Sequence, residues 1–210
     1  MAPVRPSSMS GQGGSASIVA SSTQAARTLL DLVGRVMTEG GLRGALIGGQ
    51  AVNCWVEPRI TLDVDVTVVS DGEIVRDVVA RFLAEGFVIV MKQDEGSPSG
   101  PDFVRMRHAE TSVELDMMVA KTEFETTVIG RAVNAPGLPL PVATVEDLLV
   151  LKLLASRNKD WKDLYDLGKL PDVDWAYVAR WCEVWEITDR LVNLRAELER
   201  DRQRVRDLFS

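Results

Sequence analysis

The chain has 210 residues, of which 46% are hydrophobic and 26% charged, a composition typical of a globular protein with one sizeable domain or two small ones. Its formal net charge of −7 excludes a general nucleic-acid coat protein, because phosphate binding requires a broad basic surface. No apolar run reaches the roughly 18–20 residues that a membrane span needs, and no apolar signal core follows Met1. We therefore expect a cytoplasmic protein with no membrane partner.

The first part of the chain mixes helices and strands. Residues 1–20 are rich in Ser, Gly and Ala, which predicts a flexible tail. A helix is expected from Thr23 to the glycine pair at 40–41, followed by a strand at 44–48, a short helix at 50–55 and a strand at 62–69. A helix at 73–85 and a strand at 87–91 come next. After a loop at 96–101, strands at 103–107 and 112–119 resemble a hairpin.

From Thr144 onward the pattern is helical throughout. Thr144 begins an N-terminal capping signal, and helices are expected from there to residue 154 and at 160–167, 175–185 and 188–208. The order predicts an α+β fold, with a mixed twisted sheet flanked by helices and a C-terminal helical bundle. The expected units are a tail at 1–20, a catalytic core at 21–136 and a helical domain at 137–210, with the Pro-rich segment from Gly137 as the hinge.

Two aspartates in the second expected strand carry the first chemical signal. Asp63 and Asp65 are two residues apart, so on a strand their carboxylates share one face, roughly 6–7 Å apart. Carboxylates this close on a buried strand repel each other and lose hydration, and a cation between them removes both penalties. Hard oxygen ligands in that arrangement suit Mg²⁺.

A glycine pair and a later acidic strand complete this pattern. Gly48 and Gly49 lie between a strand and a helix, where a phosphate can approach the backbone closely. A third carboxylate is expected on a neighbouring strand, and we favour Asp116, between Leu115 and Met117, over the reserve candidate Glu114. Paired carboxylates opposite a triphosphate site are the layout of metal-assisted nucleotidyl transfer.

These residues resemble the signature of the polymerase-β-like nucleotidyltransferase superfamily. That signature has a Gly-Gly or Gly-Ser pair, a spacer, Asp-x-Asp and a later lone Asp, and the spacer here is 13 residues, from Gln50 to Leu62. The form Gly-Gly-x-Ala-Val followed by Arg-x-Thr-x-Asp-Val-Asp looks like the abortive-infection toxins of type IV toxin–antitoxin systems. A second motif, from Glu146 to Leu164, is similar to a helical motif of that subgroup.

The resemblance assigns further residues to a nucleotide site. Lys152, Ser156, Lys159 and Asp163 are expected on one helical face. By resemblance, Lys152 and Arg157 would pair with the β- and γ-phosphates of an NTP. The remaining candidates for nucleotide binding are Gln50, Arg59, Lys159, Asp160 and Asp163. Arg59 is equally compatible with an ion pair to Glu57, and the segment around Lys159 with a solvated helix.

The resemblance implies a nucleotidyltransferase that moves a nucleoside monophosphate from an NTP to a hydroxyl. Two Mg²⁺ ions would be held by Asp63, Asp65 and Asp116. The acceptor would be a tRNA 3′ end or a protein, and the chain a toxin with an antitoxin encoded nearby. An antibiotic nucleotidyltransferase acting on an aminoglycoside or lincosamide is the second interpretation, and a non-catalytic nucleotide-binding module is the third.

Overall fold

The computed structural model describes residues 13–61, 63–69, 72–93 and 102–208. Its first half contains α1 (Gly13–Glu39), β1 (Arg43–Ile47), α2 (Gly48–Val52), β2 (Val64–Val69), α3 (Gly72–Ala84), β3 (Phe87–Gln93), β4 (Phe103–His108), β5 (Glu114–Val119) and α4 (Glu123–Arg131). Helix α1 begins at Gly13, within the segment 1–20 for which the sequence predicts a tail. Residues 1–12 and the loop expected at 96–101 lie outside the described residues.

The second half is helical, as predicted from the sequence. It contains α5 (Val145–Ala155), the short 3₁₀ helix η1 (Asn158–Asp160), α6 (Trp161–Gly168), α7 (Trp175–Val184) and α8 (Thr188–Leu208). The predicted cap of α5 is confirmed, since the Thr144 side chain accepts a hydrogen bond from the backbone N–H of Asp147. Within the described residues, no helix is both long enough and apolar enough to cross a membrane.

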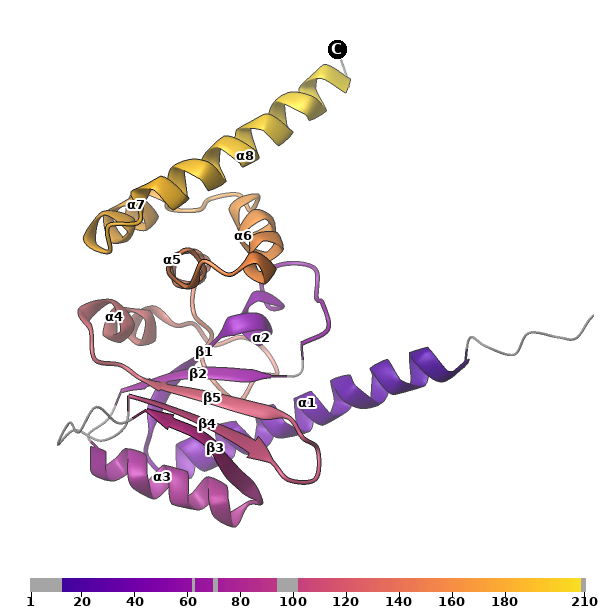
Figure 1. Cartoon of the computed structure of the whole chain (residues 1–210), viewed down its shortest axis with the longest axis vertical. Coiled ribbons are helices and arrows are strands. Elements are labelled where there is room, and N and C mark those ends of the chain that lie inside the picture. The colour runs from indigo at the N-terminus through magenta and orange to yellow at the C-terminus, as the bar shows by residue number, and fades with distance from the viewer. Residues whose placement is uncertain (1–12, 62, 70–71, 94–101, 209–210) are drawn as a thin grey trace, which may run out of the picture.

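The sheet has five strands in the order β1-β2-β5-β4-β3. Only β2 and β5 run parallel, while the other neighbours are antiparallel, including the predicted hairpin of β4 and β5. Figure 1 shows α1 and α3 on one side of the sheet, and α2 and α4 on the other, with the C-terminal helices beyond them. This is the mixed, helix-flanked sheet of a nucleotidyltransferase fold.

Buried apolar residues alternate with polar or less buried residues along β2 and β5, and the apolar ones form one side of the sheet. Val64, Val66 and Val68 are fully buried, as are Leu115 and Met117. One connected core of buried residues extends from Leu29 in α1 to Leu198 in α8, so it spans both halves of the chain. The polar side chains between the buried positions point to the other side of the sheet, toward the C-terminal helices.

The segment that joins the two halves is hydrogen-bonded to strand β1 of the sheet. The Leu46 backbone N–H donates to the Pro141 carbonyl at 2.8 Å, and the Ala143 N–H donates to the Leu46 carbonyl at 3.0 Å. Val142 forms bridges with Leu46 and Val133 and is completely buried. The end of the expected hinge therefore lies along β1 like a short additional strand.

Candidate active site

The central feature of the site is a pair of carboxylates on the two parallel strands. Asp65 in β2 and Asp116 in β5 are direct register partners, each placed between two buried apolar residues. Neighbouring strands lie about 4.8 Å apart, so the two side chains emerge side by side from one face of the sheet. The sequence pattern placed Asp116 on a strand neighbouring that of Asp65, and the register between β2 and β5 sets these two residues side by side.

Asp63 is placed differently from its prediction. It is exposed and lies one residue before the first residue of β2. The pairing of β1 with β2 ends at Ile47 and Asp65, because the chain turns into α2 at Gly48. Without a β1 neighbour, Asp63 lies outside the ladder, although it lines the same pocket as Asp65 and Asp116.

Asp65 is held where its negative charge is costly. Burial, together with the nearby carboxylates of Asp116 and Asp63, raises its pKa from 3.8 to about 6. Gly48 makes this close packing possible. Its φ of +66° favours glycine, and a β-carbon there would collide with the Asp65 carboxylate.

Gly49 is constrained in a similar way. A β-carbon at this position would lie 2.7 Å from the Thr61 hydroxyl oxygen. The backbone carbonyl of Thr61 accepts a hydrogen bond from the Gln50 side chain at 3.0 Å. Gln50 lines a neighbouring pocket, so the structure places it as a support for the segment before β2.

Arg105 is a site residue that the sequence analysis did not identify. Its guanidinium donates two hydrogen bonds to the Asp116 carboxylate, both at 2.6 Å, and lies 3.6 Å from Glu114. The bond to Asp116 raises the pKa of Arg105 above its already high ordinary value. The reserve candidate Glu114 accepts hydrogen bonds from Arg107. Alternation along β4 was the available signal, since Arg105 and Arg107 share the face of the two acidic residues of β5.

These carboxylates have the donor chemistry of a magnesium site. Asp63, Asp65 and Asp116 line one pocket, and a cation beside Asp65 would offset the burial and repulsion that raise its pKa. In the described part of the chain, however, no group of three or more His, Cys, Asp or Glu side chains is close enough to hold a metal ion. Asp65 and Asp116 therefore fit as the principal ligands, with Arg105 supplying positive charge to Asp116.

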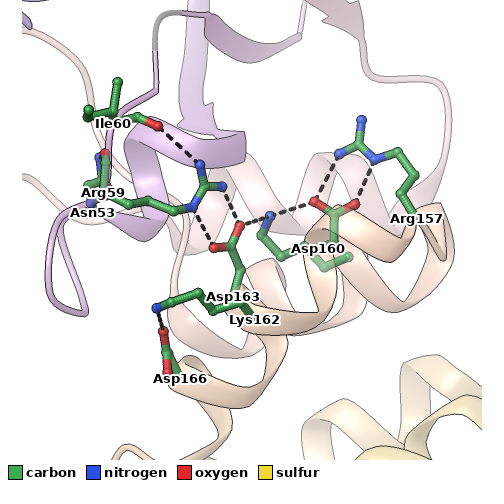
Figure 2. Close-up of polar contacts among 9 residues, drawn as sticks. Asn53, Arg59, Ile60, Arg157, Asp160, Lys162, Asp163 and Asp166 are labelled. Atoms are coloured by element: carbon green, nitrogen blue, oxygen red, sulfur yellow. Dashed lines mark hydrogen bonds and ion pairs between the residues drawn. The ribbon is translucent and has the colours of Figure 1, made fainter. Parts of the chain in front are cut away.

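The opposite wall of the pocket is a buried network of charges (Figure 2). The Lys152 ammonium donates to Asp160 at 3.1 Å and to Asp163 at 2.7 Å, and these three side chains are at most 5% exposed. Arg59 makes a two-point contact with Asp163 at 2.7 and 2.6 Å. Arg157 contacts Asp160 at 2.6 and 3.2 Å.

This network keeps both of its aspartates ionised. Burial alone would raise the pKa of Asp163, but the hydrogen bonds from Arg59 and Lys152 outweigh it and lower the pKa to about 2. The pKa of Asp160 is likewise lowered, because contacts with Arg157 and Lys152 outweigh burial. Three cations against two carboxylates leave the network with one net positive charge.

The predicted single helical face through this motif is wrong. α5 ends at Ala155, Ser156 adopts a left-handed conformation (φ 50°), and Arg157 is extended before η1 and α6 begin. The break turns α6 back, so that Lys152 and Asp163 meet without sharing a helix. Arg59 pairs with Asp163 and not with Glu57, because Asn53 holds the Arg59 backbone through two hydrogen bonds.

Both walls enclose a pocket of about 460 Å³. Two of the three cations of the Lys152 network are accessible, since the side chains of Arg59 and Arg157 are 37% and 55% exposed, whereas Lys152 lies beneath them. Gln50 and Asp163 lie behind the wall. The predicted residues that line the pocket are Gly48, Gly49, Arg59, Asp63, Asp65, Asp116, Lys152, Arg157, Lys159 and Asp160.

The order of the strands and the helices that flank them define a nucleotidyltransferase fold. A model of the family described as "Nucleotidyl transferase AbiEii toxin, Type IV TA system" matches residues 35–182, and the chain belongs to this family of transferase enzymes. The match covers β1 to α7 and thus includes both walls of the pocket.

One solved structure supports the fold. An antigenic nucleotidyltransferase-like protein from Paracoccidioides brasiliensis is 15% identical, with 84% of this chain and 93% of that chain covered and a TM-score of 0.51. Two others are more distantly similar. The antibiotic-resistance factor ANT(2'')-Ia is 16% identical, with 89% and 97% covered and a TM-score of 0.46. The lincosamide antibiotic adenylyltransferase LnuA is 15% identical, with 70% and 96% covered and a TM-score of 0.46. No curated protein sequence matches the chain.

Proposed function

We propose that this enzyme transfers a nucleoside monophosphate from a magnesium-bound NTP to a hydroxyl of a tRNA 3′ end or of a protein. The observation that carries the proposal is the register pairing of Asp65 with Asp116, across one pocket from the accessible cations Arg59 and Arg157. One wall can hold a divalent cation and the other can hold phosphate oxygens, which together meet the needs of phosphoryl transfer.

The side chains divide the chemistry between them. Asp65 and Asp116, with Asp63 beside them, would hold the magnesium, which when bound stabilises charge on the phosphate oxygens. The acceptor oxygen forms a bond to the α-phosphorus, and the bond from that phosphorus to the bridging oxygen of pyrophosphate breaks. Asp116 takes the hydroxyl proton, since Arg105 occupies only two of the roughly four lone-pair positions of its carboxylate.

The basic wall binds the departing group. Arg157 and Arg59 face the pocket and neutralise the charge that develops on pyrophosphate. Lys152 supports them from beneath, because it fixes both aspartates that orient the two arginines. Lys159 lines the pocket as a further contact for the nucleotide, and Gly48 and Gly49 allow it to approach the backbone.

The biological role that fits this family is a growth-inhibiting toxin acting in the cytoplasm with an antitoxin partner. The support is the family match, whose description names a toxin of a type IV system. Induced expression should arrest growth of a bacterial host, and Asp65→Asn should relieve the arrest. Co-expression of a neighbouring gene that restores growth would identify the antitoxin.

The acceptor can be identified in one experiment. Purified protein is incubated with each α-labelled NTP and Mg²⁺, together with total tRNA, cell protein or a panel of aminoglycosides and lincosamides. Label in the tRNA or protein fraction, lost in Asp65→Asn and Asp116→Asn, supports the proposal. Label on an antibiotic would replace it with a resistance enzyme, and nucleotide binding without transfer to any acceptor would indicate a non-catalytic module.

A further inference from the structure

A second pocket adjoins the candidate active site on the side of the C-terminal helices. It has a volume of about 460 Å³ and lies between the end of α5, the start of α6 and the first half of α8. Lys152 and Arg157 line both this pocket and the one that holds the paired carboxylates. A ligand lying across these two residues would therefore occupy both pockets.

The new pocket offers a flat aromatic surface. Trp161, the first residue of α6, is 43% exposed, and no aromatic ring among the described residues packs against it. By contrast, Trp181 in α7 is 4% exposed and packs on Phe124, with ring centres 4.9 Å apart. Trp161 is thus not needed to fill the core, and its indole remains available for stacking.

Polar groups suited to reading a base edge lie beside this indole. Asn158 in η1 and Asn193 in α8 are both exposed and line the pocket. Within the described chain, neither amide side chain makes a hydrogen bond to the protein. Each amide carries a donor and an acceptor, the combination that the Watson–Crick edge of a nucleobase requires.

The pocket walls are fixed in place. Arg190 in α8 donates to the carbonyls of Leu153 and Leu154 at 2.8 and 3.0 Å, and so joins α8 to the last turn of α5. Leu153 and Leu164 are nearly fully buried and form the apolar floor. No carboxylate lines the pocket among the described residues, while Arg157 makes the side nearest the active site positive.

We propose that this second pocket binds the nucleobase of the NTP. The base stacks on Trp161, Asn158 and Asn193 contact its edge, and Arg157 lies at the junction where the phosphates enter the catalytic pocket. A nucleotide has a flat base at one end and an anionic phosphate chain at the other. The base would lie in the pocket beside Trp161, and the phosphates in the adjoining catalytic pocket. This inference rests on the proposed nucleotidyl transfer and assigns the part of the site that recognises its donor.

Binding measurements separate the base from the phosphates. Dissociation constants are measured by calorimetry for each of four non-hydrolysable NTP analogues and for inorganic triphosphate, with Mg²⁺ present. Trp161→Ala should weaken binding of at least one NTP analogue by roughly 5- to 150-fold, the range of base–aromatic stacking, and leave triphosphate binding unchanged. Trp161→Phe should restore most of the affinity, because it keeps an aromatic face.

A pair of variants on α8 provides the matched control. Asn193→Ala should weaken NTP binding and alter the preference among bases, whereas Val192→Ala, at a 58% exposed position next to it, should change neither. Far-ultraviolet circular dichroism confirms that the Trp161 and Asn193 variants are folded.

Three results would overturn the inference. If Trp161→Ala weakens binding of a single-stranded RNA oligonucleotide but of no NTP analogue, the pocket receives the acceptor's base instead of the donor's. If the wild type binds NTP and Trp161→Ala changes the affinity for neither ligand, the base of the NTP binds elsewhere and the proposed function stands. If the wild type binds neither NTP nor triphosphate, the proposed function itself fails.

Discussion

The replacement Asp65→Asn tests the electrostatic description of the site without any substrate. Its folded pKa of about 6, against 3.8 ordinarily, means that the folded protein keeps this proton when the unfolded chain has lost it. The wild type therefore loses stability as the pH rises from about 4 to about 6, and the loss is complete above that range. The full difference corresponds to about 3 kcal/mol, and solvent at the half-buried carboxylate reduces it to roughly 1–3 kcal/mol.

Asparagine has the same shape but no charge, so it should remove this penalty. Urea unfolding in EDTA should show the variant more stable than the wild type by roughly 1–3 kcal/mol at pH 8, with an unchanged m-value. At pH 4 the advantage should nearly vanish, because Asp65 is then mostly protonated in the folded wild type. Added Mg²⁺ should stabilise the wild type at pH 8 and narrow the gap.

Asp77→Asn serves as the control, since this aspartate is exposed on α3, and its variant should stay within about 0.5 kcal/mol of the wild type. A loss of stability in Asp65→Asn of similar size at pH 4 and pH 8 would refute the reasoning. Such a result would mean that favourable hydrogen bonds stabilise the Asp65 carboxylate in the folded protein, and that burial and the neighbouring carboxylates do not destabilise it.

Three further variants test other parts of the site. Lys152→Met leaves two buried aspartates without their shared cation and should lower the free energy of unfolding by about 3–5 kcal/mol in urea. Gly48→Ala should cost about 1–2 kcal/mol from its positive φ alone and should abolish transfer, measured with labelled NTP, because the new methyl displaces Asp65. Arg105→Gln removes the charge that competes for Asp116 and should tighten Mn²⁺ binding several-fold in a paramagnetic resonance titration.

Each of these three variants has a matched control variant elsewhere in the chain. Lys162 pairs with Asp166 at the surface, so Lys162→Met should change stability by less than about 1 kcal/mol. Gly137 also has a positive φ, but a β-carbon there would meet only the Arg27 side chain, so Gly137→Ala should cost stability and leave transfer intact. Arg107→Gln breaks the contact with Glu114 and should not alter Mn²⁺ affinity. Equal effects within any pair would contradict the corresponding argument.

The sequence predicted the strands that carry the acidic pair because their alternation is strong. Buried valines flank Asp65, and Leu115 and Met117 flank Asp116, so a period of two residues was visible in both strands. The predicted start of β2 at residue 62 was too early, because the end of a strand depends on its neighbour and β1 turns away at Gly48. The pairing between two strands depends on the tertiary structure, so the sequence of β2 alone does not show where its pairing with β1 ends.

Helix α4 was missed. It has a capping box formed by Thr122 and Glu125, but its apolar face is short, with only Phe124 and Val128 buried. The break after α5 was predicted, but the placing of residues from both sides of it on one helical face was wrong, because Ser156 reverses the chain and the buried contacts of Lys152 hold α6 back against α5. Arg105 could have been found by pairing charges across the expected hairpin.

The bonds between Leu46 and the 141–143 segment limit how this protein can be dissected. A fragment ending at residue 136 would leave the outer margin of β1 bare, with its amides and carbonyls open to another chain. Such a fragment would tend to associate in solution even though it retains Asp63, Asp65 and Asp116. Fragments intended for crystallisation or partner screening should therefore extend at least through residue 143.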